Sequence, residues 1–210
     1  MSQLVQWALR FALILPAIIL HEVSHGYVAY LLGDPTAKRA GRLTLNPLKH
    51  IDPFGTILLP ILLIVISGTG FGYAKPVPVN PNAFKDYRKG FFLTAIAGPT
   101  TNIVLAALSG LGVRLLGTTS LFGLALLYFA SANLVLVFFN LIPIPPLDGS
   151  RIIPLFLSDS GMQKYHQVEQ YGFAILMLVL WGIPALFNIS PIGIYLNYTV
   201  DPLLRLFVGF

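Results

Sequence analysis

Residues 4–32 read LVQWALRFALILPAIILHEVSHGYVAYLL, an apolar stretch long enough to cross a membrane as a helix, with an ionisable cluster inside it. The cluster is His-Glu-Val-Ser-His at positions 21–25. Residues four apart on a helix are separated by about 40° around its axis, so His21 and His25 point the same way and can share one metal ion. Glu22 lies on the same flank. Charged groups are costly at membrane depth, by about 2.5 kcal/mol or more, so the cluster indicates a functional site rather than histidines that merely bond between helices.

The composition of the whole chain agrees with a membrane setting. Of its 210 residues, 56% are hydrophobic and only 10% are charged, and the mean hydropathy is +0.78. These values predict an integral, multi-pass membrane protein whose first segment is a retained helix. Cysteine is absent, which excludes thiolate ligands and a cysteine nucleophile. The net charge of +5 is explained better by cytoplasmic loops than by binding to nucleic acid, because the basic residues form no long tract.

Apolar runs predict an all-α polytopic membrane protein, a bundle of about five to six transmembrane or re-entrant helices in a single domain, 1–210. The runs cover residues 4–32, 54–67, 91–116, 121–147, 171–187 and 192–208. Two short extended segments are expected near the active site. Residues 42–46 alternate in character and resemble a short strand, and residues 74–81 cannot be helical because prolines recur at alternate positions. Such segments could pair with an unwound substrate, although ordinary interfacial loops are the simpler interpretation.

The orientation of the chain follows from its basic residues. Both flanks of the run 54–67 are basic and would prefer the cytoplasm, and the run is short for a span, so we expect it to be re-entrant or shallow. The histidine cluster lies nearer the end of the first helix that faces this basic side. The active site is therefore expected nearer the cytoplasmic side, with the amino terminus outside. The flanking basic residues are Lys38, Arg39, Arg42, Lys49, Lys75, Lys85, Arg88 and Lys89.

A catalytic zinc usually has three protein ligands and an open position for water, so a third ligand must come from elsewhere in the chain. Asp148 is the candidate, because it follows a proline-broken apolar stretch that begins at Asn140, and prolines at membrane depth mark backbone that lines a protein cavity. An ordinary loop aspartate before Gly149 is the alternative. The other acidic residues besides Glu22 occur at turns or run ends, where water is the expected neighbour: Asp34, Asp52, Asp86, Asp159, Glu169 and Asp201.

The HExxH pentad at 21–25, paired with a distant Asn140 and with Leu147-Asp148-Gly149, resembles the site-2 protease family of intramembrane zinc metalloproteases, specifically its compact prokaryotic members. The resemblance implies one zinc ion held by His21, His25 and Asp148, water activation by Glu22, and cleavage of a substrate transmembrane helix. The PDZ and CBS domains of larger relatives are not seen. Further segments that look like this subgroup are Ala97-Gly98-Pro99-Thr100-Thr101-Asn102, residues 41–55 and residues 74–81.

Other polar residues in or near the apolar runs are assigned less specific roles. Asn102 and Asn140 could contact substrate or an oxyanion, or could equally bond across a helix interface, and the family resemblance favours function. Asn133 is interpreted as structural. Gly98 is expected to permit close helix approach. His50 and His166 lie near run ends, where interfacial or solvated histidines are expected.

The leading functional hypothesis is an intramembrane endopeptidase that cuts single-span membrane proteins in a prokaryotic cell membrane. Glu22 would take a proton from the attacking water and pass it to the leaving amine. One alternative is a zinc-binding but inactive membrane chaperone or adaptor, which would have no use for a glutamate beside the metal. Another is a metal transporter, which should show several polar sites along a path rather than one concentrated cluster.

Overall fold

The structure is a computed structural model that describes residues 3–67 and 72–209. The described residues form helices and loops without a β-strand, as the apolar runs predict. The helices, including short 3₁₀ and π turns marked η, are α1 (Gln3–Leu31), α2 (Thr36–Arg39), η1 (Pro47–Lys49), η2 (Pro53–Leu58), α3 (Leu59–Ser67), η3 (Pro81–Ala83), α4 (Tyr87–Leu116), α5 (Leu121–Asn140), η4 (Asp148–Phe156), α6 (Asp159–Glu169), α7 (Gly172–Met177), η5 (Leu178–Gly182), α8 (Ile183–Phe187) and α9 (Pro191–Val208).

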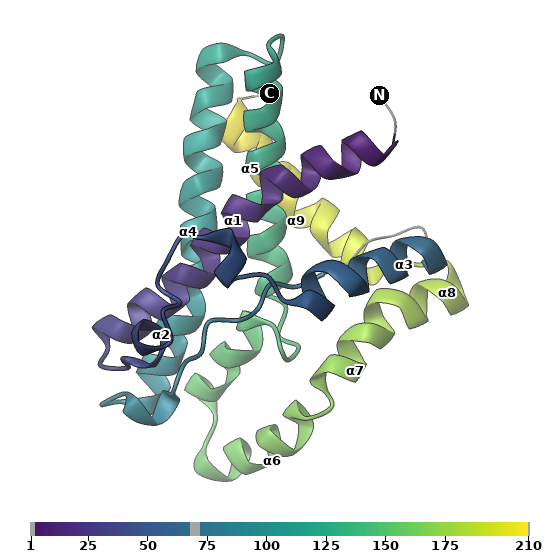
Figure 1. Cartoon of the computed structure of the whole chain (residues 1–210). Coiled ribbons are helices and arrows are strands. Elements are labelled where there is room, and N and C mark those ends of the chain that lie inside the picture. Colours follow the sequence, from purple (N-terminus) through teal and green to yellow (C-terminus); the bar gives the residue numbers. More distant parts are fainter. Residues whose placement is uncertain (1–2, 68–71, 210) are drawn as a thin grey trace.

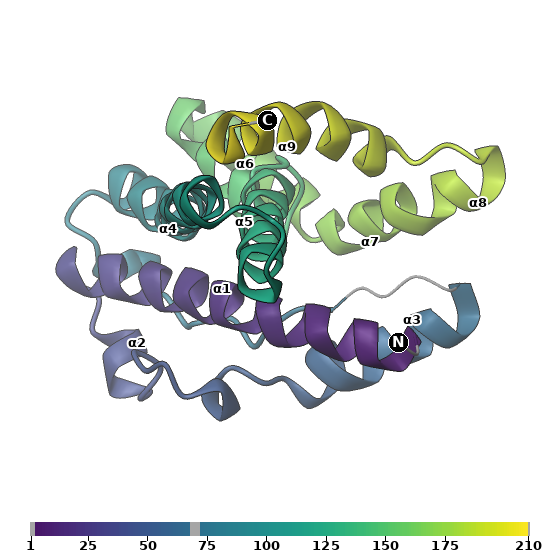
Figure 2. The same ribbon diagram turned by 90° about the horizontal axis from the view of Figure 1, so that it is seen from above.

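The helices α4 and α5 form a hairpin at the centre of the bundle. Viewed from above, α1 lies on one side of this pair and α9 lies on the other (Figure 2). The turn between α4 and α5 begins at Gly117, which has a φ of +67° that glycine adopts without strain, and Ser120 then caps α5 by accepting the Gly123 N–H at 3.0 Å. Ala106, Leu134 and Val200 bring α4, α5 and α9 together in one buried cluster.

Three of the helices are long and apolar enough to cross a membrane. These are α1 over Ala12–Leu31, α4 and α5, and a fourth span is possible if the bent pair Ser160–Glu169 and Gly172–Phe187 counts as one. Among the described residues, the shorter apolar helix at Pro53–Val65 does not reach this length. The chain is therefore an integral membrane protein built from a helical bundle (Figure 1).

The chain that follows the segment predicted to be re-entrant, residues 54–67, contacts the start of that segment. The segment begins in η2 and continues through α3, and after residues 68–71, which lie outside the described part, the chain comes back at Tyr73. The Tyr73 N–H donates to the Gly55 carbonyl at 3.0 Å, and the Thr56 hydroxyl donates to the Tyr73 carbonyl at 2.8 Å. Tyr73 therefore lies beside the start of the segment, and the prediction that residues 54–67 enter and leave the membrane at one face stays a prediction.

One expected extended segment is an irregular loop and the other is free of helix except at its last residue. The prediction of a short strand at 42–46 is wrong, because side chains rather than a neighbouring strand contact this backbone: the His50 ring donates to the Thr44 carbonyl at 2.8 Å. Residues 74–80 contain no helix, as the prolines require, whereas Pro81, the last residue of the segment predicted to be non-helical, begins the 3₁₀ helix η3.

Two residues expected near water are buried instead. His50 is 1% exposed and Asp34 is fully buried. The loop after α1 folds back against residues 74–80, where the Lys75 N–H donates to the His50 carbonyl at 2.9 Å. The Asn80 N–H likewise donates to Oδ2 of Asp34 at 2.6 Å. Both residues therefore lie against a segment that is distant in the sequence, which a local sequence pattern does not predict.

Candidate metal centre

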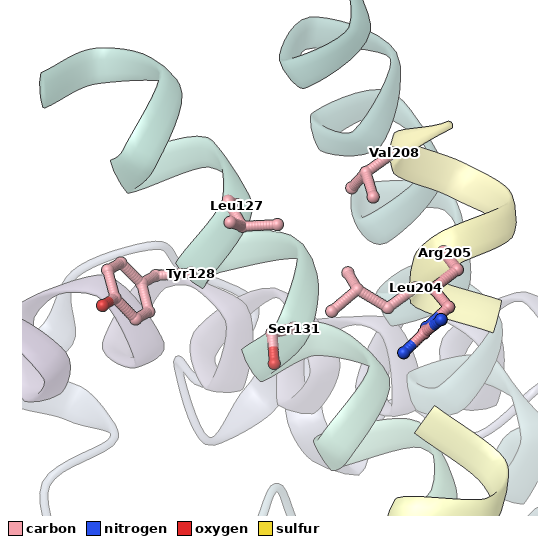
Figure 3. Close-up of a pocket in the computed structure, with 6 residues that line it drawn as sticks. All are labelled: Leu127, Tyr128, Ser131, Leu204, Arg205 and Val208. Carbon is pink, nitrogen blue, oxygen red and sulfur yellow. The ribbon is translucent and has the colours of Figure 1, made fainter. Parts of the chain in front are cut away.

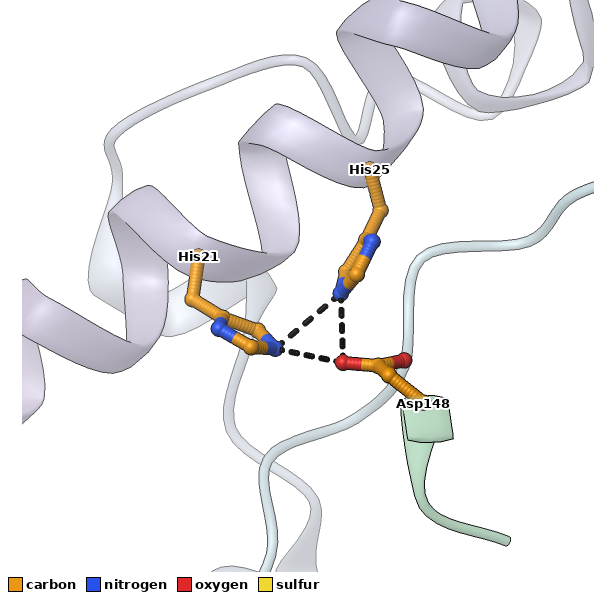
Figure 4. Close-up of side chains that lie close together, drawn as sticks. All are labelled: His21, His25 and Asp148. Carbon is orange, nitrogen blue, oxygen red and sulfur yellow. Dashed lines mark hydrogen bonds and ion pairs between the residues drawn. The ribbon is translucent and has the colours of Figure 1, made fainter. Parts of the chain in front are cut away.

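The three predicted ligands meet in one buried cluster. Nε2 of His21 and Nε2 of His25 lie 3.0 Å apart, and each lies 3.1 Å from Oδ2 of Asp148. Figure 4 shows the two rings pointing from one helix toward the carboxylate of a separate segment. The two histidines are 4% exposed and Asp148 is 7% exposed. In the described residues, this is the group of histidine and acidic side chains whose ligand atoms converge closely enough to hold a metal ion.

The histidines and the aspartate of the cluster are positioned by different structural elements. The histidines project from adjacent turns of α1, as the helical spacing requires. Asp148 begins η4, directly after the proline-broken stretch, and a tight turn holds it there because the Ser150 hydroxyl donates to the Leu147 carbonyl at 2.6 Å. The Tyr165 hydroxyl of α6 in turn donates to the Ser150 carbonyl at 2.8 Å. The Asp148 side chain therefore reaches the histidines from the start of η4, which these two hydrogen bonds hold in place.

Hydrogen bonds to the far side of each ring determine which nitrogen faces the cluster. Nδ1 of His25 lies 2.6 Å from the Thr94 carbonyl, which can only accept, so Nδ1 of His25 carries the proton. Nδ1 of His21 donates to Oδ1 of Asn102 at 2.5 Å. With neutral rings, both Nε2 atoms are then acceptors that face each other and a carboxylate oxygen. Three acceptors this close repel one another unless a cation lies among them.

The cluster fits a zinc ion in chemistry and in size. Ligand atoms about 2.0–2.1 Å from a tetrahedral zinc lie about 3.3 Å apart, close to the observed 3.0–3.1 Å separations. Space for the ion exists because residue 98 of α4 is glycine: a Cβ atom there would lie 2.5 Å from Nε2 of His25 and 2.6 Å from Nε2 of His21. Gly98 is expected from the sequence to permit close approach between helices. In the structure, it lets α4 approach the two histidine rings of α1 closely.

Glu22 contacts the extended segment beside the cluster. It is half-buried on α1, next to His21, and its Oε2 accepts the N–H of Val77 at 2.9 Å. The carboxylate is therefore held by a backbone amide from the segment 74–81. A single hydrogen bond of this kind orients a carboxylate while leaving further acceptor positions on its two oxygens.

Asn102 and Asn133 form a chain that supports His21. Asn102 is fully buried; while its oxygen accepts from His21, its Nδ2 donates to Oδ1 of Asn133 at 2.7 Å and to the Ala17 carbonyl at 3.3 Å. These contacts employ both amide hydrogens of Asn102 and favour a role in orienting the ring of His21. Contact of Asn102 with substrate or an oxyanion stays a prediction. The interpretation of Asn133 as structural agrees with this contact, although the sequence did not connect Asn133 with His21.

Asn140 is not brought to the cluster. Its Nδ2 donates to the Leu136 carbonyl of its own helix at 2.9 Å, and in the part of the chain that the structure describes no hydrogen bond joins it to the metal-binding side chains. This hydrogen bond within α5 gives no support to the predicted contact of Asn140 with substrate, which stays a prediction.

Two surface hollows lie apart from the three ligand side chains. One, of about 510 Å³, lies between α5 and α9 (Figure 3), and the other, of about 450 Å³, lies along the seam of α1 and α4. The second is lined partly by Val23 and Ser24 of the histidine pentad, and Ser24 and Thr101 there share a hydrogen bond of 2.7 Å. Among their described lining residues neither hollow includes a ligand side chain. The residues of the first are Leu127, Tyr128, Ser131, Leu204, Arg205 and Val208.

Comparison with known proteins gives matches that cover almost the whole chain. The sequence profile of peptidase family M50 matches residues 116–183. YwhC of Bacillus subtilis, whose name describes a candidate zinc metalloprotease, is 43% identical over 205 residues, covering 90% of this chain and 85% of YwhC. Rip2 of Mycolicibacterium smegmatis, named in the same way, is 32% identical over 79% of this chain and 64% of its own length. Zinc metalloprotease MJ0392 of Methanocaldococcus jannaschii is 29% identical over 87% of this chain and 45% of its own length. No solved structure gives a significant match.

Proposed function

Because this chain belongs to peptidase family M50, the site-2 protease family of zinc metalloproteases, we propose that it hydrolyses peptide bonds within the transmembrane segments of single-span membrane proteins. One observation carries the proposal: His21 and His25, on a helix apolar enough to cross the membrane, converge with Asp148 of η4 in one buried cluster. An ionisable cluster at that depth is costly, which supports a functional role. We assign these three residues to a single zinc ion.

Zinc held by three protein ligands supplies a Lewis acid that activates water and polarises a carbonyl group. Glu22 acts as the general base, taking a proton from the attacking water and delivering it to the departing amine. The amide of Val77 holds the carboxylate of Glu22 beside the two histidines during both transfers. Asn102 and the Thr94 carbonyl keep the proton of each ring on Nδ1, so that both Nε2 atoms face the reaction site.

The substrate helix has to open before it is cut. Each carbonyl of an intact helix is held in an internal hydrogen bond and is enclosed by its neighbouring turns, which leaves no approach for a water molecule and a base. Backbone groups freed in hydrocarbon cost several kcal/mol each unless they find new partners. Carbonyl groups of the extended segment 74–81 are suitable partners for the freed amides.

The active site is proposed to lie nearer the cytoplasmic face of a prokaryotic membrane. His25 lies six residues before the end of α1 at Leu31, and the loop beyond it carries Lys38, Arg39 and Arg42. Loops rich in lysine and arginine stay in the cytoplasm. The relatives named above, from bacteria and an archaeon, support the prokaryotic setting.

The test is cleavage of a panel of single-span membrane proteins by the purified chain in lipid vesicles. The native chain is expected to cut at least one of them within its membrane segment, and Glu22→Gln is expected to keep its zinc and lose nearly all turnover. Glu169→Gln, on the exposed end of α6, is the matched control and should cut at the native rate. Binding of the panel without cleavage would favour an adaptor, and zinc flux across the vesicle without cleavage would favour a transporter.

A further inference from the structure

The extended segment 74–81 is attached to the region around α1 at three points along its length. The Arg42 guanidinium donates to the Lys75 carbonyl at 2.6 Å, the Val77 N–H donates to Glu22, and the Asn80 N–H donates to Oδ2 of Asp34 at 2.6 Å. The middle attachment is the base of the proposed reaction. The other two secure the segment on either side of it.

Asp34 is an unusual anchor because its carboxylate is fully buried. One oxygen accepts the Asn80 N–H, and the other accepts the N–H of Thr36 at 2.9 Å and the hydroxyl of Thr36 at 2.5 Å. Burial by itself would raise the pKa of the Asp34 carboxyl, but the hydrogen bonds from Thr36 and Asn80 lower its pKa below the ordinary value. The anchor is therefore an ionised group, whose hydrogen bonds are stronger than those of a neutral one.

The register of the segment against α1 is restricted by its own sequence. Pro76 and Pro78 have no N–H, so between Lys75 and Val79 the amide of Val77 is the one backbone donor available to Glu22. The buried side chain of Val77 packs where Gly26 leaves room, since a Cβ at Gly26 would lie 2.7 Å from Val77 Cγ1. A shift of the segment by one residue would present a proline to Glu22 and remove this hydrogen bond.

We propose that Asp34 is a positioning residue for Glu22. By holding Asn80, it keeps the segment in the register in which the Val77 amide orients the Glu22 carboxylate beside the metal-binding histidines. This inference rests on the proposed function, in which Glu22 is the general base. Asp34 itself touches neither the substrate bond nor the metal ligands in this assignment, and it acts through the segment alone.

Asp34→Asn tests the proposal because it disrupts the contact with the Asn80 N–H while it can keep the contact with Thr36. The amide oxygen can still accept from Thr36, whereas the amide nitrogen then faces the Asn80 N–H, a second donor. In vesicles, we expect kcat to fall about tenfold, the factor expected for losing one hydrogen bond to a charged group, with KM and zinc content unchanged. Asp86→Asn is the matched control: Asp86 caps α4 by accepting the Lys89 N–H at 3.1 Å, and its loss should leave kcat at the native value.

Amide hydrogen exchange gives a readout that is independent of catalysis. Between residues 74 and 80 only Ala74, Lys75, Val77, Val79 and Asn80 carry an amide hydrogen, so a peptide covering this segment reports directly on the attachments. In Asp34→Asn, exchange in this peptide is expected to be about tenfold faster than in the native chain, and in Asp86→Asn it should be unchanged.

Native exchange and native kcat in Asp34→Asn would overturn the proposal, and so would faster exchange with native kcat. If Asp34→Asn does not fold, Val77→Pro removes the amide donor directly and leaves Asp34 intact. Loss of kcat at constant KM and zinc content in that variant supports the role of the segment, and native kcat overturns it. If the native chain cuts no substrate at all, the proposed function fails, while the exchange experiment still decides whether Asp34 holds the segment.

Discussion

Replacing Gly98 by alanine is expected to empty the metal centre while leaving the fold nearly intact. The added Cβ would lie 2.5 Å from Nε2 of His25 and 2.6 Å from Nε2 of His21, whereas ordinary contact begins at 3.4 Å. The rings would have to withdraw by about 3.4 − 2.5 = 0.9 Å and 3.4 − 2.6 = 0.8 Å. Zinc ligands tolerate shifts of only about 0.2 Å, so we expect zinc affinity to fall about 100-fold or more, or roughly 2.7 kcal/mol.

The effect of Gly98→Ala on stability is expected to be small. Overpacking costs about 1–3 kcal/mol, but alanine in a helix interior is favoured over glycine by about 1 kcal/mol, which leaves a net loss of roughly 0–2 kcal/mol. Zinc bound per protein molecule, competition with a calibrated chelator, and the thermal midpoint of the zinc-free protein separate the two quantities.

Gly112→Ala is the matched control for this change. It lies on the same helix, and its added Cβ would meet the flexible end of the Leu126 side chain at 2.8 Å. Its zinc affinity should equal that of the native protein. Native zinc affinity in Gly98→Ala would refute the reasoning, because it would mean that the histidine rings meet the metal somewhere other than the space in front of residue 98.

Four further predictions concern the ligands, the topology and the substrate. Asp148→Ala should lower zinc content, measured by elemental analysis after purification; full zinc and full activity would remove Asp148 from the ligand set. Asn102→Leu should weaken zinc binding about 10–100-fold, because Nδ1 of His21 loses its acceptor; chelator competition measures this, and an unchanged affinity would contradict the orienting role. Single cysteines at Lys49 and Lys85 should react with an impermeant thiol reagent from the same side of the membrane; labelling from opposite sides would show that residues 54–67 cross it. Model substrates with glycine or asparagine near the cut should be cleaved faster than leucine and alanine versions, because a weakened helix opens more easily; equal rates would show that unwinding does not limit the reaction.

The sequence alone was sufficient for features that depend on local spacing. The four-residue interval between His21 and His25 places both on one face of any helix, and long apolar runs identify the helical bundle. Asp148 could be selected because prolines mark its stretch as irregular backbone at membrane depth. The alternation of prolines likewise excludes helix from residues 74–80.

How these features support one another depends on contacts between segments that are far apart in the sequence. Asn102 and His21 are 81 positions apart in the sequence, and Val77 and Glu22 are 55 positions apart; contacts at such separations depend on how helices pack, which no local period encodes. The burial of Asp34 and the irregular path of residues 42–46 arise in the same way, because the loop after α1 folds back on the segment 74–81. Helical periodicity is a property of neighbours in sequence, whereas the environment of a side chain is a property of neighbours in space. The three side chains of the candidate metal centre could therefore be selected from the sequence, while the contacts that orient them could be identified only in the folded chain.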